Sequence, residues 1–257
     1  MQYHLLSSLP PYCVNSKFYY QTDRCIQYLQ GFIYRIFKSA WDALFQNFLF
    51  PDCDSRASIS TAPPLLSTTS HKLDRDQRSA VGHILRIQGS PPYVVTGPDC
   101  VPEGKSFADL REPSRTGVVV SEAVYQLCRK SPEHRILICA PSNSCCDVLM
   151  RSLVKVIPES IMFRANAAFR EKDEVPEDIL RSSLYKQSCF SCPPVEKLRK
   201  YRVIFSTFMS SFRLHDKGIA SGHFSQIFLV DASSVHLLLS QKHWWPWLTL
   251  QTRLLVL

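Results

Sequence analysis

The sequence contains no run of eighteen uncharged apolar residues, because Arg35, Lys38 and Asp42 interrupt its most hydrophobic region. This absence argues against a membrane-spanning helix. The opening MQYHLLSSLPP also lacks the positively charged start and the apolar stretch of a secretory signal. We therefore interpret the ten cysteines as reduced thiols inside the cell rather than as a disulfide framework.

Two further patterns are missing, namely an internal repeat and a second cysteine pair. Cys189 and Cys192 have C-x-x-C spacing, but no other pair stands at a distance suited to structural zinc, so we predict no metal site. Positive charge, in contrast, is in excess, with a formal net charge of +8 and a pI near 9.0. This balance favours polyanionic partners, such as RNA, DNA or an anionic membrane.

The chain divides near residue 70. Between Cys25 and Leu49, apolar residues recur at intervals of three and four, which is the period of a helix with one buried face. That helix packs either on a core or on a membrane surface. Residues 50 to 70 then supply Pro, Ser and Thr without periodicity. We predict a helical segment and linker over residues 1 to 70.

Beyond residue 70, short apolar runs rich in β-branched residues alternate with helical patterns. The runs and patterns are YVVTG (93 to 97), SEAVYQLCRK (121 to 130), RILICA (135 to 140), CDVLMRSLVKVI (146 to 157), YRVIFST (201 to 207) and QIFLVD (226 to 231). This alternation predicts an α/β fold, in which a parallel sheet carries helices on both faces. Ligands of such folds bind at the carboxyl ends of the strands.

The first of these strand ends leads into GPDCVPEGKS, residues 97 to 106. A phosphate-binding loop has the form G-x-x-x-x-G-K-[ST], but here two extra residues separate the glycines. Pro102 removes one N–H donor, and the sequence after Ser106 reaches Pro113 too soon for a stable helix. An irregular surface loop is therefore favoured over a working phosphate loop. If the loop works, the nucleotide-binding residues are Gly97, Gly104, Lys105 and Ser106.

Several segments occur in the order seen in superfamily 1 RNA helicases. They are LDRDQRSAV (73 to 81), PPYVVTGP (91 to 98), VSEAVYQL (120 to 127), ILICAPSNSCCDVLMRSL (136 to 153), MFRANAAFR (162 to 170), YRVIFSTFMSSFRL (201 to 214) and GHFSQIFLVDAS (222 to 233). The chain resembles the family of the plant silencing-defective RNA helicase, the animal Moloney-leukaemia-virus-ten helicase and fly Armitage. The resemblance covers residues 40 to 234 and reaches only the first of two motor domains.

This resemblance implies an incomplete RecA-like P-loop NTPase domain over residues 71 to 234. It also implies ATP and Mg²⁺ as cofactors, and single-stranded RNA bound without sequence preference. Silencing proteins are implied as further partners, and the cytoplasm with its ribonucleoprotein granules as the location. No membrane partner is implied.

Carried over residue by residue, the resemblance implies that Gln77 reads the adenine edge; a surface Gln on an amphipathic helix is the alternative. The residues implied to contact the RNA backbone are Pro141, Ser142, Asn143, Ser144, Ser206 and Thr207. For the first group, the alternative is that Ser142 or Ser144 merely caps the helix that follows.

The sequence departs from the family at both halves of the nucleotide site. The family has glycine-threonine-glycine-lysine-threonine directly before its first helix, so Lys105 lies in an insertion. The family's F-L-D-E-A is Phe228-Leu229-Val230-Asp231-Ala232 here. Matching the alanines gives Asp231 the role of the base, whereas matching the apolar run makes it the metal carboxylate. In both registers one of two carboxylates is missing, and Asp231 is the sole catalytic candidate.

Residues 235 to 257 contain no acid and are rich in Trp and Leu, which we interpret as an aberrant tail. We expect the second motor domain, whose arginines complete phosphoryl transfer, to be missing. We predict a helicase-like protein with weak, sequence-independent RNA binding and little or no ATP hydrolysis. The alternatives are an ATP-dependent RNA helicase of post-transcriptional gene silencing and a gene fragment without function.

Overall fold

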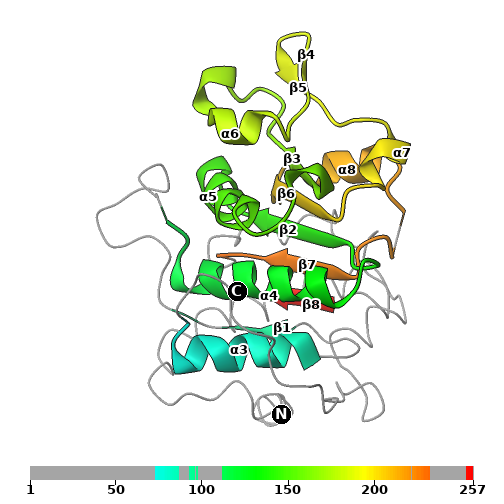
Figure 1. Cartoon of the computed structure of the whole chain (residues 1–257). Coiled ribbons are helices and arrows are strands. Elements are labelled where there is room, and N and C mark those ends of the chain that lie inside the picture. The colour runs from blue at the N-terminus through cyan, green and yellow to red at the C-terminus, as the bar shows by residue number, and fades with distance from the viewer. Residues whose placement is uncertain are drawn as a thin grey trace, which may run out of the picture.

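A computed structural model describes residues 73–86, 93–95, 97, 112–220, 222–231 and 253–256. Figure 1 shows a central sheet with helices packed against it. The helices are α3 (Arg75–Arg86), α4 (Arg115–Lys130), α5 (Asn143–Val154), α6 (Glu177–Leu180), α7 (Val195–Leu198) and α8 (Phe212–Asp216), with 3-10 turns η4 (Glu159–Ile161) and η5 (Lys172–Glu174). The helix predicted over Cys25 to Leu49, and the linker after it, lie outside the described residues.

The central sheet has six strands in the order β1-β8-β7-β2-β6-β3, and every neighbouring pair is parallel. The strands are β1 (Tyr93–Val94), β2 (Ile136–Ala140), β3 (Met162–Ala165), β6 (Val203–Thr207), β7 (Gln226–Leu229) and β8 (Arg253–Val256). Strands β4 (Tyr185–Lys186) and β5 (Cys189–Phe190) form a separate antiparallel hairpin. The predicted parallel sheet is confirmed.

Helices cover both faces of this sheet, and each face has its own apolar core. Val120 and Leu127 of α4 lie with Leu149 of α5 in the first core. Leu198 of α7 and Leu214 of α8 lie in the second core. Strands β2, β6 and β7 are buried along their whole length, as expected for central strands of a parallel sheet. The mainly apolar sequences of these strands agree with burial on both faces.

Helix α4 is the longest described helix, with 16 residues. Ser114 caps it, because the Ser114 Oγ accepts a hydrogen bond from the Gly117 N–H at 3.0 Å. Val120, Ala123, Val124 and Leu127 follow the helical period and are all buried. The helix ends at Ser131, whose N–H donates to the Leu127 carbonyl.

The sheet extends beyond residue 234, where the sequence predicts that the motor domain ends. Residues 253–256 form β8, which pairs with β1 on one side and β7 on the other. These residues therefore pair with the sheet, and the division into a motor domain and an aberrant tail stays a prediction. The remainder of the predicted tail, residues 235–252 and 257, lies outside the described residues.

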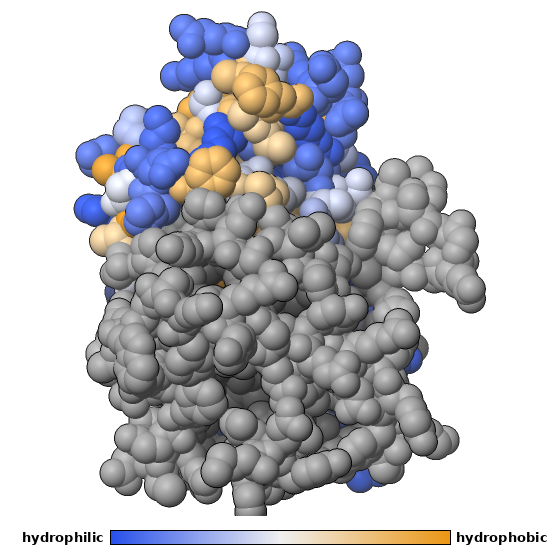
Figure 2. All heavy atoms as spheres, turned by 180° about the vertical axis from the view of Figure 1, so that it is seen from behind, coloured by the Kyte–Doolittle hydropathy of each residue, from blue (hydrophilic) through white to orange (hydrophobic). Residues whose placement is uncertain are grey.

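On the face seen in Figure 2, hydrophilic side chains cover much of the described part of the chain. Figure 2 shows apolar side chains gathered in one place among hydrophilic ones, above the region drawn in grey. The large apolar side chains exposed on the described part of the chain are Phe169, Tyr185, Met209 and Phe212. Within the described ranges, none of the helices has the length and apolar character needed to cross a bilayer.

Candidate functional site

The described strands of the central sheet all end at the same edge, which we call the carboxyl edge, because they are parallel. A hollow lies there between the start of α4, the start of α5 and the end of β7. We call it the strand-end hollow, and its lining residues are Glu112, Pro113, Ser114, Cys145, Val148, Leu149, Val230 and Asp231. Its position agrees with the rule that ligands of parallel sheets bind beyond the carboxyl ends of the strands.

Gly97, just beyond β1, lies directly against the first turn of α4. A Cβ atom on Gly97 would stand 2.6 Å from Thr116 Cγ2, so a larger residue here would force the strand and the helix apart. The first described helix after this glycine, α4, begins at Arg115 and has no acidic residue in its first turn. Its N-terminus favours a negatively charged ligand at the hollow. Gly104, Lys105 and Ser106 lie outside the described residues.

The end of β7 presents Val230 and Asp231 to the strand-end hollow. The Val230 N–H donates to the Cys139 carbonyl at 2.8 Å, which extends the pairing with β2 by one residue. The Val230 side chain is buried in the core beneath α4 and α5. Asp231 is half-buried, and its φ of 54° lies in the left-handed region that non-glycine residues rarely adopt. The last paired position of β7 is therefore apolar, and the carboxylate comes one residue later.

Cys145 stands opposite Asp231 in the same hollow. Burial raises the pKa of the Cys145 thiol to about 12, and the Asp231 carboxylate adds to this rise. Burial also raises the pKa of the neighbouring Cys146 thiol to about 11. Both thiols are therefore protonated at neutral pH, and neither is an activated nucleophile.

Gln77 is engaged in contacts at the start of α3. Its N–H donates to Asp74 Oδ1 at 2.8 Å, and its Oε1 accepts from the Asp74 N–H at 3.1 Å, which is a reciprocal capping box. Its Nε2 donates to the Arg115 carbonyl at 3.1 Å, and Arg115 also pairs with Asp74. Gln77 thus lies beside the start of α4, with its amide used by the fold. Adenine reading by Gln77 stays a prediction.

The polar residues after β2 are largely used by the protein itself. Ser142 caps α5, because its Oγ accepts from the Cys145 N–H at 3.2 Å. Asn143 Oδ1 accepts from Arg164 Nη2 at 2.9 Å. Pro141 and Ser144 are half-buried at the same turn and take no part in these two contacts. The capping alternative holds for Ser142, and RNA contact by this group of four residues stays a prediction.

The two residues at the end of β6 are buried. The Ser206 side chain is 0% exposed, and no described group hydrogen-bonds to its Oγ. Thr207 is 7% exposed, and its Oγ1 donates to Ser210 Oγ at 2.9 Å. The surrounding strands and helices therefore cover both residues, and RNA contact by Ser206 and Thr207 stays a prediction.

An ionic network at the carboxyl edge has no counterpart among the sequence predictions. Arg164 is buried and donates from Nε to Asp147 Oδ1 at 3.0 Å. Arg170 donates from Nη2 to Asp147 Oδ2 at 2.6 Å, and from Nη1 to Asn166 Oδ1 at 2.8 Å. One carboxylate thus holds two arginines and joins α5 to β3 and the loop after it. The pattern of arginines in MFRANAAFR is the signal that could have indicated it.

The described residues contain no group of three or more His, Cys, Asp or Glu side chains that could hold a metal ion. Cys192 is buried and Cys189 is half-buried, and both are free thiols. Two described carboxylates line the strand-end hollow. Asp231 follows the end of β7, and Glu112 precedes α4.

Curated helicases align with most of the chain. It is 28% identical over 186 residues to the helicase MOV-10 of Gallus gallus, which covers 70% of this chain and 18% of that protein. It is 30% identical over 189 residues to mov-10-B.1 of Danio rerio, with 72% of this chain and 17% of that protein covered. The chain is a homologue of the MOV-10 helicases. The predicted resemblance is confirmed.

The chain is also 32% identical over 163 residues to the RNA helicase Mov10l1 of Homo sapiens. This alignment covers 62% of the chain and 12% of Mov10l1. The chain thus spans less than a fifth of the length of these curated relatives. No family model matches it.

Two solved structures also align with it. The UvsW helicase of bacteriophage T4 has a TM-score of 0.41 and 9% identity, covering 77% of this chain and 56% of that one. A nuclease-deletion mutant of the restriction-modification enzyme LlaGI, in complex with a DNA substrate mimic, has a TM-score of 0.44 and 12% identity, covering 73% of this chain and 17% of that one.

Proposed function

We propose that this MOV-10 homologue is an RNA-binding, helicase-like protein with little or no ATP hydrolysis. The observation that carries the proposal is Val230, an apolar side chain at the last paired position of β7. Phosphoryl transfer by helicase-type sites needs a carboxylate for Mg²⁺ and a second group that orients the attacking water. At the end of β7, Asp231 supplies one carboxylate, whereas the family has one for the metal and one for the base.

Nucleotide binding is better supported than turnover. Residues at the start of α4 and Asp231 line the same hollow, and a helix N-terminus and a carboxylate are the kinds of group that bind a phosphate and Mg²⁺, respectively. When bound, ATP would supply a phosphoryl group whose transfer the described residues are poorly equipped to promote. We therefore expect ATP to bind weakly and to persist.

An ATPase assay on the purified full chain tests this proposal. We expect phosphate release in the presence of single-stranded RNA to stay at the level of a no-protein blank. Turnover that both Lys105→Ala and Asp231→Asn abolish would contradict the proposal, because it would show a working phosphate loop. The two variants also serve as matched controls for contaminating ATPases, which neither substitution would affect.

RNA binding is proposed at the start of α5. Because Ser142 and Asn143 use their side chains within the protein, the available groups are the first backbone N–H groups of the helix. Such amides, at the positive end of a helix dipole, contact phosphates without reading base sequence. We therefore expect single-stranded RNAs of equal length and different sequence to bind alike, and less tightly as salt rises.

Ser144→Glu tests this site without damaging the helix. A carboxylate in the first turn of α5 repels phosphate but interacts favourably with the helix dipole. We expect RNA affinity to fall about 5-fold while the free energy of unfolding stays equal or rises by about 0.5 kcal/mol. Ser79→Glu on the exposed side of α3 introduces the same charge and is the matched control. Equal affinities of the two variants would place the RNA elsewhere.

An ATP-dependent RNA helicase of gene silencing is the second candidate, and the packing of Gly97 on Thr116 favours it. That contact keeps the strand, glycine and helix of a phosphate loop together. RNA-stimulated turnover in the assay above would select this candidate. A cytoplasmic location and silencing proteins as partners belong to either candidate as proposals. A gene fragment without function would show neither cooperative unfolding nor RNA binding.

A further inference from the structure

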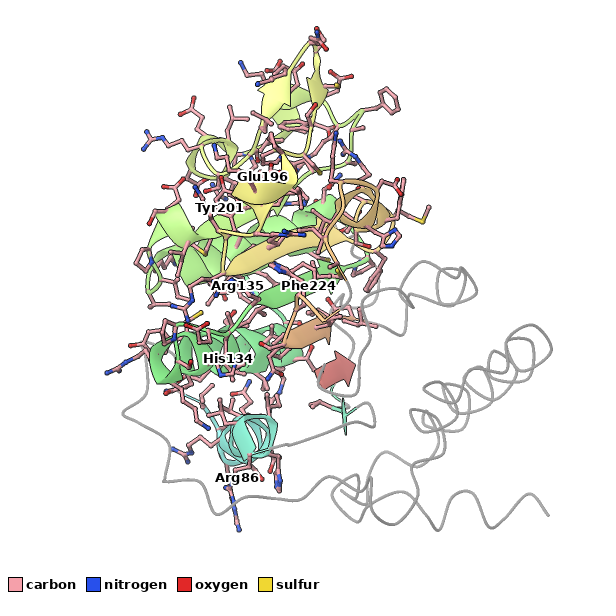
Figure 3. The ribbon with its side chains drawn as sticks, turned by 90° about the vertical axis from the view of Figure 1, so that its right-hand side faces the viewer. Arg86, His134, Arg135, Glu196, Tyr201 and Phe224 are labelled. Carbon is pink, nitrogen blue, oxygen red and sulfur yellow. The ribbon has the colours of Figure 1, made fainter. Side chains whose placement is uncertain are left out.

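The edge of the sheet opposite the carboxyl edge is strongly basic. It consists of residues 128–135 before β2, residues 195–202 before β6 and residues 222–225 before β7, and we call it the basic edge. Its cations are Arg129, Lys130, Arg135, Lys197, Arg199, Lys200 and Arg202, and its acids are Glu133 and Glu196. Figure 3 is drawn from this side, with His134, Arg135, Glu196 and Tyr201 labelled.

Hydrogen bonds hold the three segments of the basic edge together. The Ile136 N–H donates to the Arg202 carbonyl at 2.7 Å, and the Ser225 N–H donates to the Arg135 carbonyl at 2.8 Å. Arg202 Nη2 donates to the carbonyls of Cys128 and Ser131. The pKa of His223 is lowered by burial, and the charges of Arg135 and Arg199 lower it further, which agrees with their closeness. The cations therefore form one surface.

Some of these cations have a structural reason to be there. Arg129 and Lys130 lie in the last turn of α4, where the helix dipole favours positive charge, and Arg202 binds the carbonyls at that end. Lys197 and Arg199 stand at the end of α7, but this helix has only four residues, so its dipole is a weaker reason for their charge. Lys197, Arg199 and Lys200 are all exposed. Within the described ranges, the ion pairs involve Arg115, Arg151, Arg164 and Arg170, and none involves a cation of the basic edge.

The character of the basic edge favours RNA phosphates over a membrane. Surfaces that enter the lipid interface combine cations with exposed aromatic or large aliphatic side chains. The large exposed apolar side chains of the described chain, such as Phe169 and Met209, lie outside these three segments. Closely set cations without apolar side chains suit a phosphate backbone, to which they bind by releasing counterions.

We propose that the basic edge is a second contact surface for RNA, separate from the start of α5. It binds phosphates through Lys197, Arg199 and Lys200, and it rests on the proposed RNA-binding function. The two edges are separated by the length of β2, five residues or roughly 17 Å. A single RNA strand can therefore contact both edges when it is long enough to pass around the domain.

The test compares two triple variants of the full chain. Lys197→Gln, Arg199→Gln and Lys200→Gln neutralise the basic edge. Lys172→Gln, Arg181→Gln and Lys186→Gln remove the same charge from exposed positions near the β4–β5 hairpin. The affinity for a fluorescent single-stranded RNA is measured against salt concentration. We expect the first triple to lose about 10-fold at low salt, with a salt slope smaller by about 2, and the second to lose less than about 3-fold.

Three results would overturn the inference. One is an equal loss in both triples, because net charge alone would then explain it. Another is an RNA affinity of the first triple that equals that of the unmodified chain. The basic edge would then not contact RNA, whereas RNA binding at the start of α5 would not be contradicted. The third is a first triple that loses binding to phosphatidylserine vesicles but not to RNA, which would make the surface a membrane contact. If the unmodified chain binds no RNA, the proposed function fails as well. Urea unfolding of both triples should match the unmodified chain within about 0.5 kcal/mol.

Discussion

Arg164 and Arg170 at the carboxyl edge differ from Arg199 at the basic edge in their burial and in their partners. At the carboxyl edge, Arg164 and Arg170 are almost fully buried, with side chains 0% and 5% exposed, and they share the Asp147 carboxylate. At the basic edge, Arg199 is exposed at the end of α7, and no described carboxylate pairs with it.

This difference separates cations that hold the fold from cations that are available to a ligand. A buried guanidinium is tolerated only with a partner, because leaving it unpaired costs several kcal/mol. An exposed cation needs no partner and contributes little to stability. The net charge of +8 does not distinguish the two kinds. The two kinds are distinguished by whether a carboxylate pairs with the cation in the folded protein.

The largest effect should come from breaking the shared carboxylate. Asp147→Ala leaves both Arg164 and Arg170 without their anion, and we expect it to lower the free energy of unfolding by about 3–5 kcal/mol. Asp178→Ala removes an exposed pair with Arg151 and should cost at most about 1 kcal/mol. Urea unfolding monitored by circular dichroism gives both values. Equal costs would show that the buried network is no stronger than a surface pair.

Alkaline pH should lower the free energy of unfolding through the buried thiols of the carboxyl edge. The folded pKa values of Cys145 and Cys146, about 12 and about 11, exceed the unfolded value of 9.0. Their contribution to stability is therefore complete below pH 9 and is lost as the pH rises toward 12.

We expect the double variant Cys145→Ala, Cys146→Ala to lose roughly 4 kcal/mol less stability than the unmodified chain between pH 8 and pH 10.5, about 2 kcal/mol for each thiol. Urea midpoints across this range provide the measurement. Taking the difference between the two proteins cancels the titration of lysines and tyrosines. A parallel decline of both proteins would indicate that the thiols are accessible.

The smallest effect concerns the capping box at the start of α3. Gln77→Ala removes the Oε1 acceptor and the contact with Arg115, and we expect a loss of about 1 kcal/mol. Gln77→Glu keeps the capping acceptor but removes the amide donor. If Gln77→Glu weakens ATP binding at unchanged stability, Gln77 reads the adenine. If both variants affect only thermal unfolding, its role is confined to the fold.

The sequence by itself determined the local elements and the family. Short, mainly apolar runs predicted β2, β6 and β7, because a strand buried on both faces has few polar positions. The capping alternative for Ser142 was equally local, since it depends on residues three apart. The helicase resemblance followed from motifs in order, which the MOV-10 homology confirms.

Only the tertiary structure decided which polar groups remain available. Asp147 meets Arg164 and Arg170 across 17 and 23 residues, and such a pairing depends on how α5 packs against β3. The same packing buries the Ser206 hydroxyl, brings Arg253–Val256 into the sheet as β8 and places Val230 beneath α4 and α5. Periodicity records whether a residue is buried, but not which distant residue it meets, because that choice is made when the elements pack together.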